Sequence, residues 1–222
     1  MLTNEKMPAT LPRITISNGE KTVIFQSMMH IASPEFYDDI RNDMQGLSSE
    51  DYVFFYEGVK SGSEQSLEKL SQLMGTDISE DMYNTIAKIA GLTYQGDEVY
   101  TGILPSTNVD LSTDEIVALA AEESIPEPTN EQIDIVKIIE EKYPLLSPEQ
   151  KYMARVIAQG GMNMLLRKYT DPQMPISLKK AVPVFSIILD KRDSVVVEAI
   201  NTSPNQNIYM HYGALHFPGI LA

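Results

Sequence analysis

Two apolar, strand-like runs in this chain end in the same way, and this repetition restricts its fold more than any other feature. The run "KTVIFQSMMH" reaches the small residue Ser27 and then His30 three positions later. The run "NQNIYMHYGALH" reaches Gly213 and then His216 at the same offset. Small residues at Ser27 and Gly213 are expected to let the backbone turn sharply and pass close to a ligand.

A third apolar run, "DYVFFYEG", ends at Glu57. A short continuous apolar run is typical of a strand buried on both faces of a parallel sheet. Ligands bind outside the carboxyl ends of the strands in open α/β sheets. If the three strands run parallel, the sequence predicts that His30, Glu57 and His216 gather at one edge of the sheet.

The rest of the chain predicts an α/β protein with a central, mostly parallel sheet flanked by helices. A strand pair at about 13–17 and 21–26 is joined by the turn "SNGEK", and a helix follows Ser33 as N-cap and Pro34. The other predicted helices are at about 64–74, 79–90, 112–123, 129–142 and 147–169. We expect residues 1–222 to form a single domain, with a helical insertion at roughly 64–175.

The segment "PVFSIILDKRDSVVVEAINTS" predicts one long helix, because Val184, Ile188, Val195 and Ala199 recur at helical spacing. Arg192 falls on this apolar stripe. A buried arginine needs a charged partner, since an unpaired buried charge is strongly destabilising. The alternative is a long side chain that extends to solvent.

The charge balance restricts the partners. Seventeen Lys and Arg against thirty-one Asp and Glu give a net charge of −14, which disfavours nucleic acid and would concentrate divalent cations. The chain has no cysteine, so thiol nucleophiles and thiolate metal sites are excluded. No apolar run is long enough to cross a membrane, and the N-terminus does not resemble a signal peptide. The cellular compartment stays open.

The chain stops soon after His216, at "HFPGILA", where a helix begins. We expect the natural chain to continue beyond Ala222, so that this helix covers the site. Without such a cover, exposed apolar surface could promote a homodimer.

Two imidazoles and a carboxylate suit a divalent metal such as Mn, Co or Zn, so His30, His216 and Glu57 are candidate ligands. Each also has a structural interpretation, as a hydrogen-bonded histidine or a solvated loop carboxylate. His211, the third histidine, alternates within its strand and fits a core or supporting role behind the ligands.

The motifs "VIFQSMMH", "YEG", "NVDLS", "LDKRD" and "HYGALHFPGI", in this order, resemble the TraB/Tiki superfamily. That group includes pheromone-shutdown proteins and is related to erythromycin esterases and ChaN-like haem-binding proteins. Its pattern of two G-x-x-H motifs, a glutamate and an arginine corresponds here to His30, Glu57, Arg192 and Gly213 with His216. Ser27 stands where glycine is usual, and Asp110 also matches a family position.

Three functions follow as hypotheses. The resemblance to the Tiki branch implies metal-dependent peptide hydrolysis, with Glu57 as ligand or general base and Arg192 stabilising an oxyanion or orienting Glu57. The second is a metal-independent esterase in which a histidine is the base. The third is a binding module that captures a peptide pheromone or haem-like ligand without chemistry.

Overall fold

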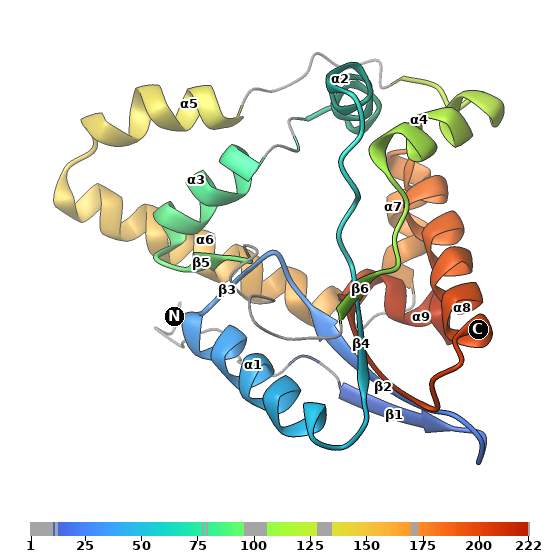
Figure 1. Cartoon of the computed structure of the whole chain (residues 1–222). Coiled ribbons are helices and arrows are strands. Elements are labelled where there is room, and N and C mark those ends of the chain that lie inside the picture. The colour runs from blue at the N-terminus through green and yellow to red at the C-terminus, as the bar shows by residue number, and fades with distance from the viewer. Residues whose placement is uncertain are drawn as a thin grey trace.

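The structure of the chain is a computed structural model, and it describes residues 11, 13–76, 78, 80–95, 106–127, 135–169 and 173–221. The fold is mixed α/β, as the sequence predicts, with one main sheet between layers of helices (Figure 1). Among the described helices, none combines the length and the apolar character that crossing a bilayer requires.

The main sheet has five strands in the order β1-β2-β7-β4-β6. Its strands are β1 (Arg13–Ser17), β2 (Thr22–Met28), β7 (Asn207–Gly213), β4 (Val53–Tyr56) and β6 (Ser106–Asn108). β1 pairs antiparallel with β2, and every other pairing in this sheet is parallel. The three strands that lead to His30, Glu57 and His216 are therefore parallel neighbours, which confirms the predicted arrangement.

Side chains alternate between the two faces of the sheet, and each face carries its own core. On one face, Ile24, Phe54 and Tyr209 pack against helix α1 (Pro34–Ser48). On the other, Phe25 and Met210 pack against Val196 of helix α8 (Arg192–Thr202) and the short helix α9 (Phe217–Ile220). Figure 1 shows α1 on one side of the sheet, with α8 and α9 on the other.

Local sequence signals explain where several helices begin and end. The Ser33 side chain accepts a hydrogen bond from the Phe36 N–H at the start of α1, and Pro34 occupies the first turn. Ser112 and Glu115 form a capping box at the start of α4 (Thr113–Glu122). Gly75 ends α2 (Glu64–Met74) with a φ of 69°, which glycine adopts without strain. α2 and α4 pack together in a third core.

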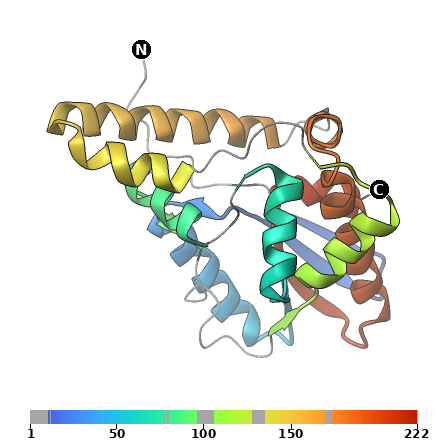
Figure 2. The same ribbon diagram turned by 90° about the horizontal axis from the view of Figure 1, so that it is seen from above.

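The middle of the chain is mostly helical, as expected. Helices α3 (Glu80–Ala90), α5 (Ile135–Lys142) and α6 (Pro148–Tyr169) agree with predicted segments, although the first six residues of the predicted helix at 129–142 lie outside the described residues. The sequence analysis missed three elements in and after this region: β6, β5 (Thr93–Tyr94), which pairs with β3 (Ile31–Ala32), and helix α7 (Gln173–Ala181). In Figures 1 and 2, α3, α5 and α6 extend to one side of the sheet.

The long helix predicted at 183–203 is interrupted. Ile187–Lys191 form a π-helical turn directly before α8, and this turn inserts a residue and rotates the buried face. Ile187, Arg192 and Val196 are buried, whereas Ile188 and Val195 are only half-buried. The predicted apolar stripe is therefore only partly correct. The prediction required a regular α-helix throughout, and the π-helical turn moves Ile188 and Val195 off the buried face.

The expected turn at Ser27 is also wrong. β2 continues through Ser27 to Met28, and Ser27 pairs with Tyr212 while Met28 pairs with Gly213. Ser27 is buried inside the sheet. The two histidine motifs thus lie on neighbouring parallel strands but differ in register by one residue.

Candidate functional site

The carboxyl ends of the parallel strands bring a group of charged side chains together. Glu57 directly follows β4, and Asp110 lies two residues after β6. His216 ends the 3-10 turn Ala214–His216 after β7, and Arg192 begins α8 opposite these strand ends. This convergence follows from the parallel topology, since parallel strands end at the same edge of a sheet.

Arg192 is the centre of the group. Its side chain is buried, and its guanidinium makes a two-pronged contact with Asp110, from Nε to Oδ1 at 2.7 Å and from Nη2 to Oδ2 at 2.5 Å. Nη2 also donates to Glu57 Oε1 at 2.7 Å. The guanidinium carbon lies 5.7 Å from the centre of the Tyr212 ring. The structure therefore selects the buried, paired alternative for Arg192 over one that extends to solvent.

Glu57 is held by partners from three elements. Oε1 accepts from Arg192 and lies 3.5 Å from His216 Nε2, and Oε2 accepts from the Gly213 N–H. Burial alone would raise the pKa of Glu57, but the Arg192 guanidinium and the hydrogen bond with His216 hold it well below its usual range. Glu57 is thus a fixed carboxylate at neutral pH, with lone pairs left for a further partner.

Gly213 provides the space that Glu57 needs. Its φ is −53°, which any residue can adopt, so backbone freedom is not the reason for glycine here. A Cβ at this position would stand 2.7 Å from Glu57 Oε2, closer than real Cβ contacts. The sequence predicted that the backbone at Gly213 passes close to a ligand, and in the structure the group that lies against it is the Glu57 carboxylate.

His216 pairs with a carboxylate that the sequence analysis did not single out. His216 Nδ1 lies 2.6 Å from Asp193 Oδ1, and both residues are buried. Burial alone would lower the pKa of His216, but the hydrogen bonds to Asp193 and Glu57 raise it. Asp193 is the last residue of "LDKRD", beside Arg192. Helical spacing in the sequence did not indicate that Asp193 faces the site, because the π-helical turn before α8 determines which side of this helix faces the site.

The contact between Asp193 and His216 also depends on a glycine. A Cβ at Gly219, in α9, would stand 1.9 Å from Asp193 Oδ2, so a larger residue would displace the carboxylate. With Nδ1 bound to Asp193, the Nε2 atom of His216 faces Glu57. A carboxylate on the far nitrogen is the usual way in which proteins orient a histidine toward a metal or a proton.

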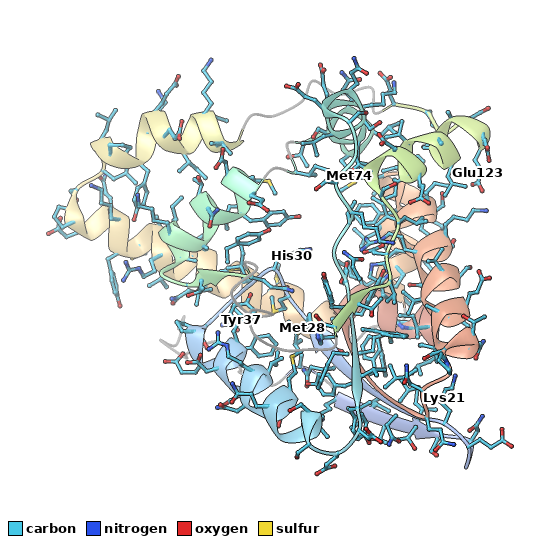
Figure 3. All side chains as sticks on the ribbon, viewed as in Figure 1. Lys21, Met28, His30, Tyr37, Met74 and Glu123 are labelled. Atoms are coloured by element: carbon cyan, nitrogen blue, oxygen red, sulfur yellow. The ribbon has the colours of Figure 1, made fainter. Side chains whose placement is uncertain are left out.

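His30, labelled in Figure 3, lies near this group. It is exposed, whereas His216 is buried. The centre of the His30 ring is 4.9 Å from that of the Tyr83 ring. Loss of surrounding water lowers the pKa of His30, opposed by the charge of Glu57 and aided by those of Arg192 and His216. Because the residue is exposed, solvent screens these effects. The charges of Glu57, Arg192 and His216 reach His30, so it lies near the site. Among the ion pairs of the described residues, Glu57 pairs with Arg192 and His216 and not with His30.

The two residues expected in supporting positions have different surroundings. Asp110 binds Arg192 directly and also accepts hydrogen bonds from the Gly58 and Leu111 N–H groups. His211 points to the opposite face of the sheet from Tyr212, where its ring stacks on Tyr56 at 6.0 Å. Burial lowers the pKa of His211 to about 3, so this imidazole is neutral.

Across the described residues, no three His, Asp or Glu side chains form a ready metal-binding group. The donor chemistry nevertheless suits a divalent cation. Glu57 and Asp110 contact the Arg192 guanidinium, and Asp193 contacts His216. Three carboxylates against one guanidinium leave the site with excess negative charge when the histidines are neutral. Glu57 Oε1 and His216 Nε2 lie 3.5 Å apart, and His30 is exposed nearby. These residues fit the metal that the resemblance implies.

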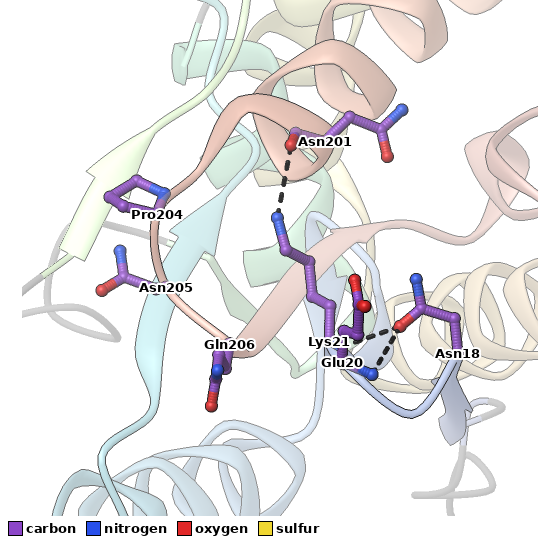
Figure 4. Close-up of a pocket in the computed structure, with 7 residues that line it drawn as sticks. All are labelled: Asn18, Glu20, Lys21, Asn201, Pro204, Asn205 and Gln206. Atoms are coloured by element: carbon purple, nitrogen blue, oxygen red, sulfur yellow. Dashed lines mark hydrogen bonds between the residues drawn. The ribbon is translucent and has the colours of Figure 1, made fainter.

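A pocket of about 350 Å³ lies at the other end of the strands, between the β1–β2 turn and the loop that precedes β7 (Figure 4). The Lys21 ammonium lies there but donates to the carbonyl oxygens of Ile200 and Ser203, at 2.5 and 2.9 Å. These contacts close the end of α8. The Lys21 contacts therefore stabilise the fold, and the pocket lies at the opposite end of the strands from the charged group.

Comparison with models of known protein families finds no match, and comparison with curated protein sequences finds none either. The resemblance to the TraB/Tiki superfamily therefore rests on the quoted motifs alone.

Proposed function

We propose that the chain is a metal-dependent hydrolase that cleaves peptide or related acyl bonds, with His30 and His216 as metal ligands and Glu57 as a third ligand or the general base. The observation that carries this proposal is the connected series Asp193–His216–Glu57–Arg192 at the carboxyl ends of parallel strands. It combines an oriented imidazole and a guanidinium on either side of one fixed carboxylate. A bound Mn, Co or Zn ion would supply Lewis acidity, which polarises a carbonyl and activates water.

The residues of the chain have separate roles in this proposal. Asp193 holds the Nδ1–H of His216, which leaves Nε2 available as a donor atom. Glu57 accepts a proton from the attacking water, or shares in ligation through Oε1. Arg192 fixes the orientation of Glu57 and keeps it ionised, because its guanidinium is bound to that carboxylate and to Asp110.

A second candidate is a metal-independent hydrolase, and the contact between Asp193 and His216 favours it. A histidine whose Nδ1 is bound to a carboxylate has the arrangement of a general base. In this alternative His216 Nε2 removes the proton from water, and Arg192 with the Gly213 N–H provides positive charge nearby.

One experiment separates the two candidates. The protein is incubated with a mixed peptide library and with simple esters, first in excess EDTA and then after addition of Mn, Co or Zn. Hydrolysis that appears only with metal supports the first function, and hydrolysis that persists in EDTA supports the second. Glu57→Gln is expected to lower the rate at least about a hundredfold, whereas Glu20→Gln, remote from the site, is the control. No hydrolysis under any condition would contradict both.

A further inference from the structure

Helix α6 carries an apolar stripe that no described part of the chain covers. Three apolar side chains of this stripe are at least half exposed: Met153 at 50%, Ile157 at 61% and Met164 at 57%. Gly160 lies on the same line, so the positions 153, 157, 160 and 164 follow a 4-3-4 spacing. This spacing places all four on one face of a helix and is the spacing of helices that pair along their length.

The opposite side of α6 is the side that attaches it to the rest of the molecule. Gln159 Nε2 donates to the Ala90 carbonyl of α3 at 2.8 Å. Gln159 stands two residues after Ile157 and so about 200° round the helix. α3 and α5 lie on one side of α6 in Figure 2, with α6 at the edge of the molecule. The stripe therefore faces away from the chain's own helices.

The side chains of α5 and α6 are less buried than is usual for two helices in a folded protein. Among the described side chains of residues 136–164, none is buried. Leu145, in the turn between α5 and α6, is 79% exposed. Large exposed apolar side chains gathered on one element are typical of an interaction surface.

The stripe is complementary to itself when two copies run antiparallel. The positions 153, 157, 160 and 164 are symmetric about the midpoint of α6, which spans Pro148–Tyr169. In an antiparallel pair, Met153 therefore faces the partner's Met164, and Ile157 faces the partner's Gly160. A large side chain opposite a glycine lets two helices approach closely and interlock.

The charges at the two ends of α6 also suit this direction. Glu149 and Lys151 lie in its first turn, and the sequence of its last turn contains Arg167 and Lys168. Lys151 stands two residues before Met153, about 200° round the helix and so away from the stripe, which leaves Glu149 as the charge nearer the contact. An antiparallel pair brings the first turn of one copy beside the last turn of the other, so opposite charges meet. A parallel pair would bring like charges together at both ends.

We propose that this chain forms a homodimer through α6, with the two α6 helices antiparallel and the stripe Met153, Ile157, Gly160 and Met164 at the contact. The proposal does not depend on the function of the charged site. In this dimer the contact between the two α6 helices lies at the outer edge of the α3–α5–α6 region. The two-fold axis of the dimer passes near the middle of α6.

Light scattering gives the first test. The wild-type protein is expected to have twice the 24.8 kDa mass of one chain. Ile157→Glu would place an unpaired carboxylate at the centre of the contact, so the dissociation constant is expected to rise about a hundredfold or more. Leu67→Glu, which changes an exposed leucine of α2, is the matched control and should leave the dimer intact. A wild-type monomer at every concentration, or a dimer unaffected by Ile157→Glu, would overturn the proposal.

Disulfide trapping tests the direction, since the chain has no native cysteine. A mixture of Met153→Cys and Met164→Cys proteins is expected to form an interchain disulfide under mild oxidation. Either variant alone should not, because in the antiparallel pair its two copies lie about 16 Å apart along the axis, well beyond disulfide reach. Cross-linking of a single variant with itself would overturn the antiparallel arrangement.

A lipid surface is the alternative binding partner of the α6 stripe, since the sequence of residues 135–169 has six basic and three acidic residues. Sedimentation with vesicles of phosphatidylserine and phosphatidylcholine examines it. A protein that stays monomeric and binds these vesicles through Ile157 would overturn the dimer. Absence of vesicle binding by a light-scattering dimer would support it.

Discussion

Arg192 and Asp110 form a two-pronged ion pair inside the protein, with Nε 2.7 Å from Oδ1 and Nη2 2.5 Å from Oδ2. The pair joins the first residue of α8 to the chain that follows β6, at the edge strand of the sheet. Because the same guanidinium also binds Glu57, the pair fixes the position of the candidate catalytic carboxylate. The fold and the site therefore share one side chain.

Replacing Arg192 should destabilise the fold. Arg192→Ala leaves Asp110 and Glu57 without their counter-charge in a buried place, so we expect a loss of about 3–5 kcal/mol in the free energy of unfolding. Arg192→Lys keeps the charge but not the two-pronged contact, so a smaller loss is expected. Urea unfolding measures both. Arg41→Ala, which removes an exposed ion pair with Asp38, should cost under about 0.5 kcal/mol. Equal stability of Arg192→Ala and wild type would contradict the account.

Gly213→Ala should damage the site more than the fold. The added Cβ would stand 2.7 Å from Glu57 Oε2 and force this carboxylate away from the Gly213 N–H. We expect metal binding and hydrolysis to fall at least about tenfold, since a ligand or base displaced by about 1 Å loses its geometry. Gly46→Ala in α1, where a Cβ meets nothing within 4 Å, is the control and should raise stability slightly. If the two variants behave alike, Gly213 has no role at the site.

The sequence predicted the mostly parallel sheet because this follows from local patterns. Continuous apolar runs that end in His30, Glu57 and His216 are visible without a structure, and parallel pairing then brings their ends together. Asp193 could not be found in this way, since its direction depends on the π-helical turn before α8. The same turn explains why the predicted stripe with Ile188 and Val195 is not the buried face. β6 was missed because "STN" has no apolar signal.

Asp193→Asn should lower the pKa of His216. The hydrogen bonds to Asp193 and Glu57 now raise that pKa against the effect of burial, so removal of the Asp193 charge lets burial dominate. Nuclear magnetic resonance of the three histidine rings follows the change directly. The affinity for metal is expected to fall about 10–100-fold, because the donor nitrogen loses its orienting partner. An unchanged pKa of His216 would show that Asp193 does not act on it.

His211 should make the protein less stable in mild acid. Its pKa is about 3 in the folded protein and near 6.5 in an unfolded chain, so below pH 6.5 only the unfolded chain binds a proton there. The contribution of the neutral His211 ring to the free energy of unfolding is therefore complete above pH 6.5 and is lost as the pH falls toward 3. His211→Phe should make the decline between pH 6.5 and 4.5 shallower by up to about 1.4 kcal/mol per pH unit. Denaturant unfolding across this range measures it, and parallel curves for both proteins would contradict the prediction.

Calorimetric titration of the metal-depleted protein with Mn, Co and Zn tests the central claim most directly. The account predicts that a single ion binds per chain, and that binding weakens as the pH falls through the raised pKa of His216, since the ion and the proton compete for that ring. His216→Ala should abolish binding, while His211→Phe, in the same strand region but on the other face of the sheet, should retain it. Absence of binding for all three ions, or unchanged binding by His216→Ala, would contradict the claim.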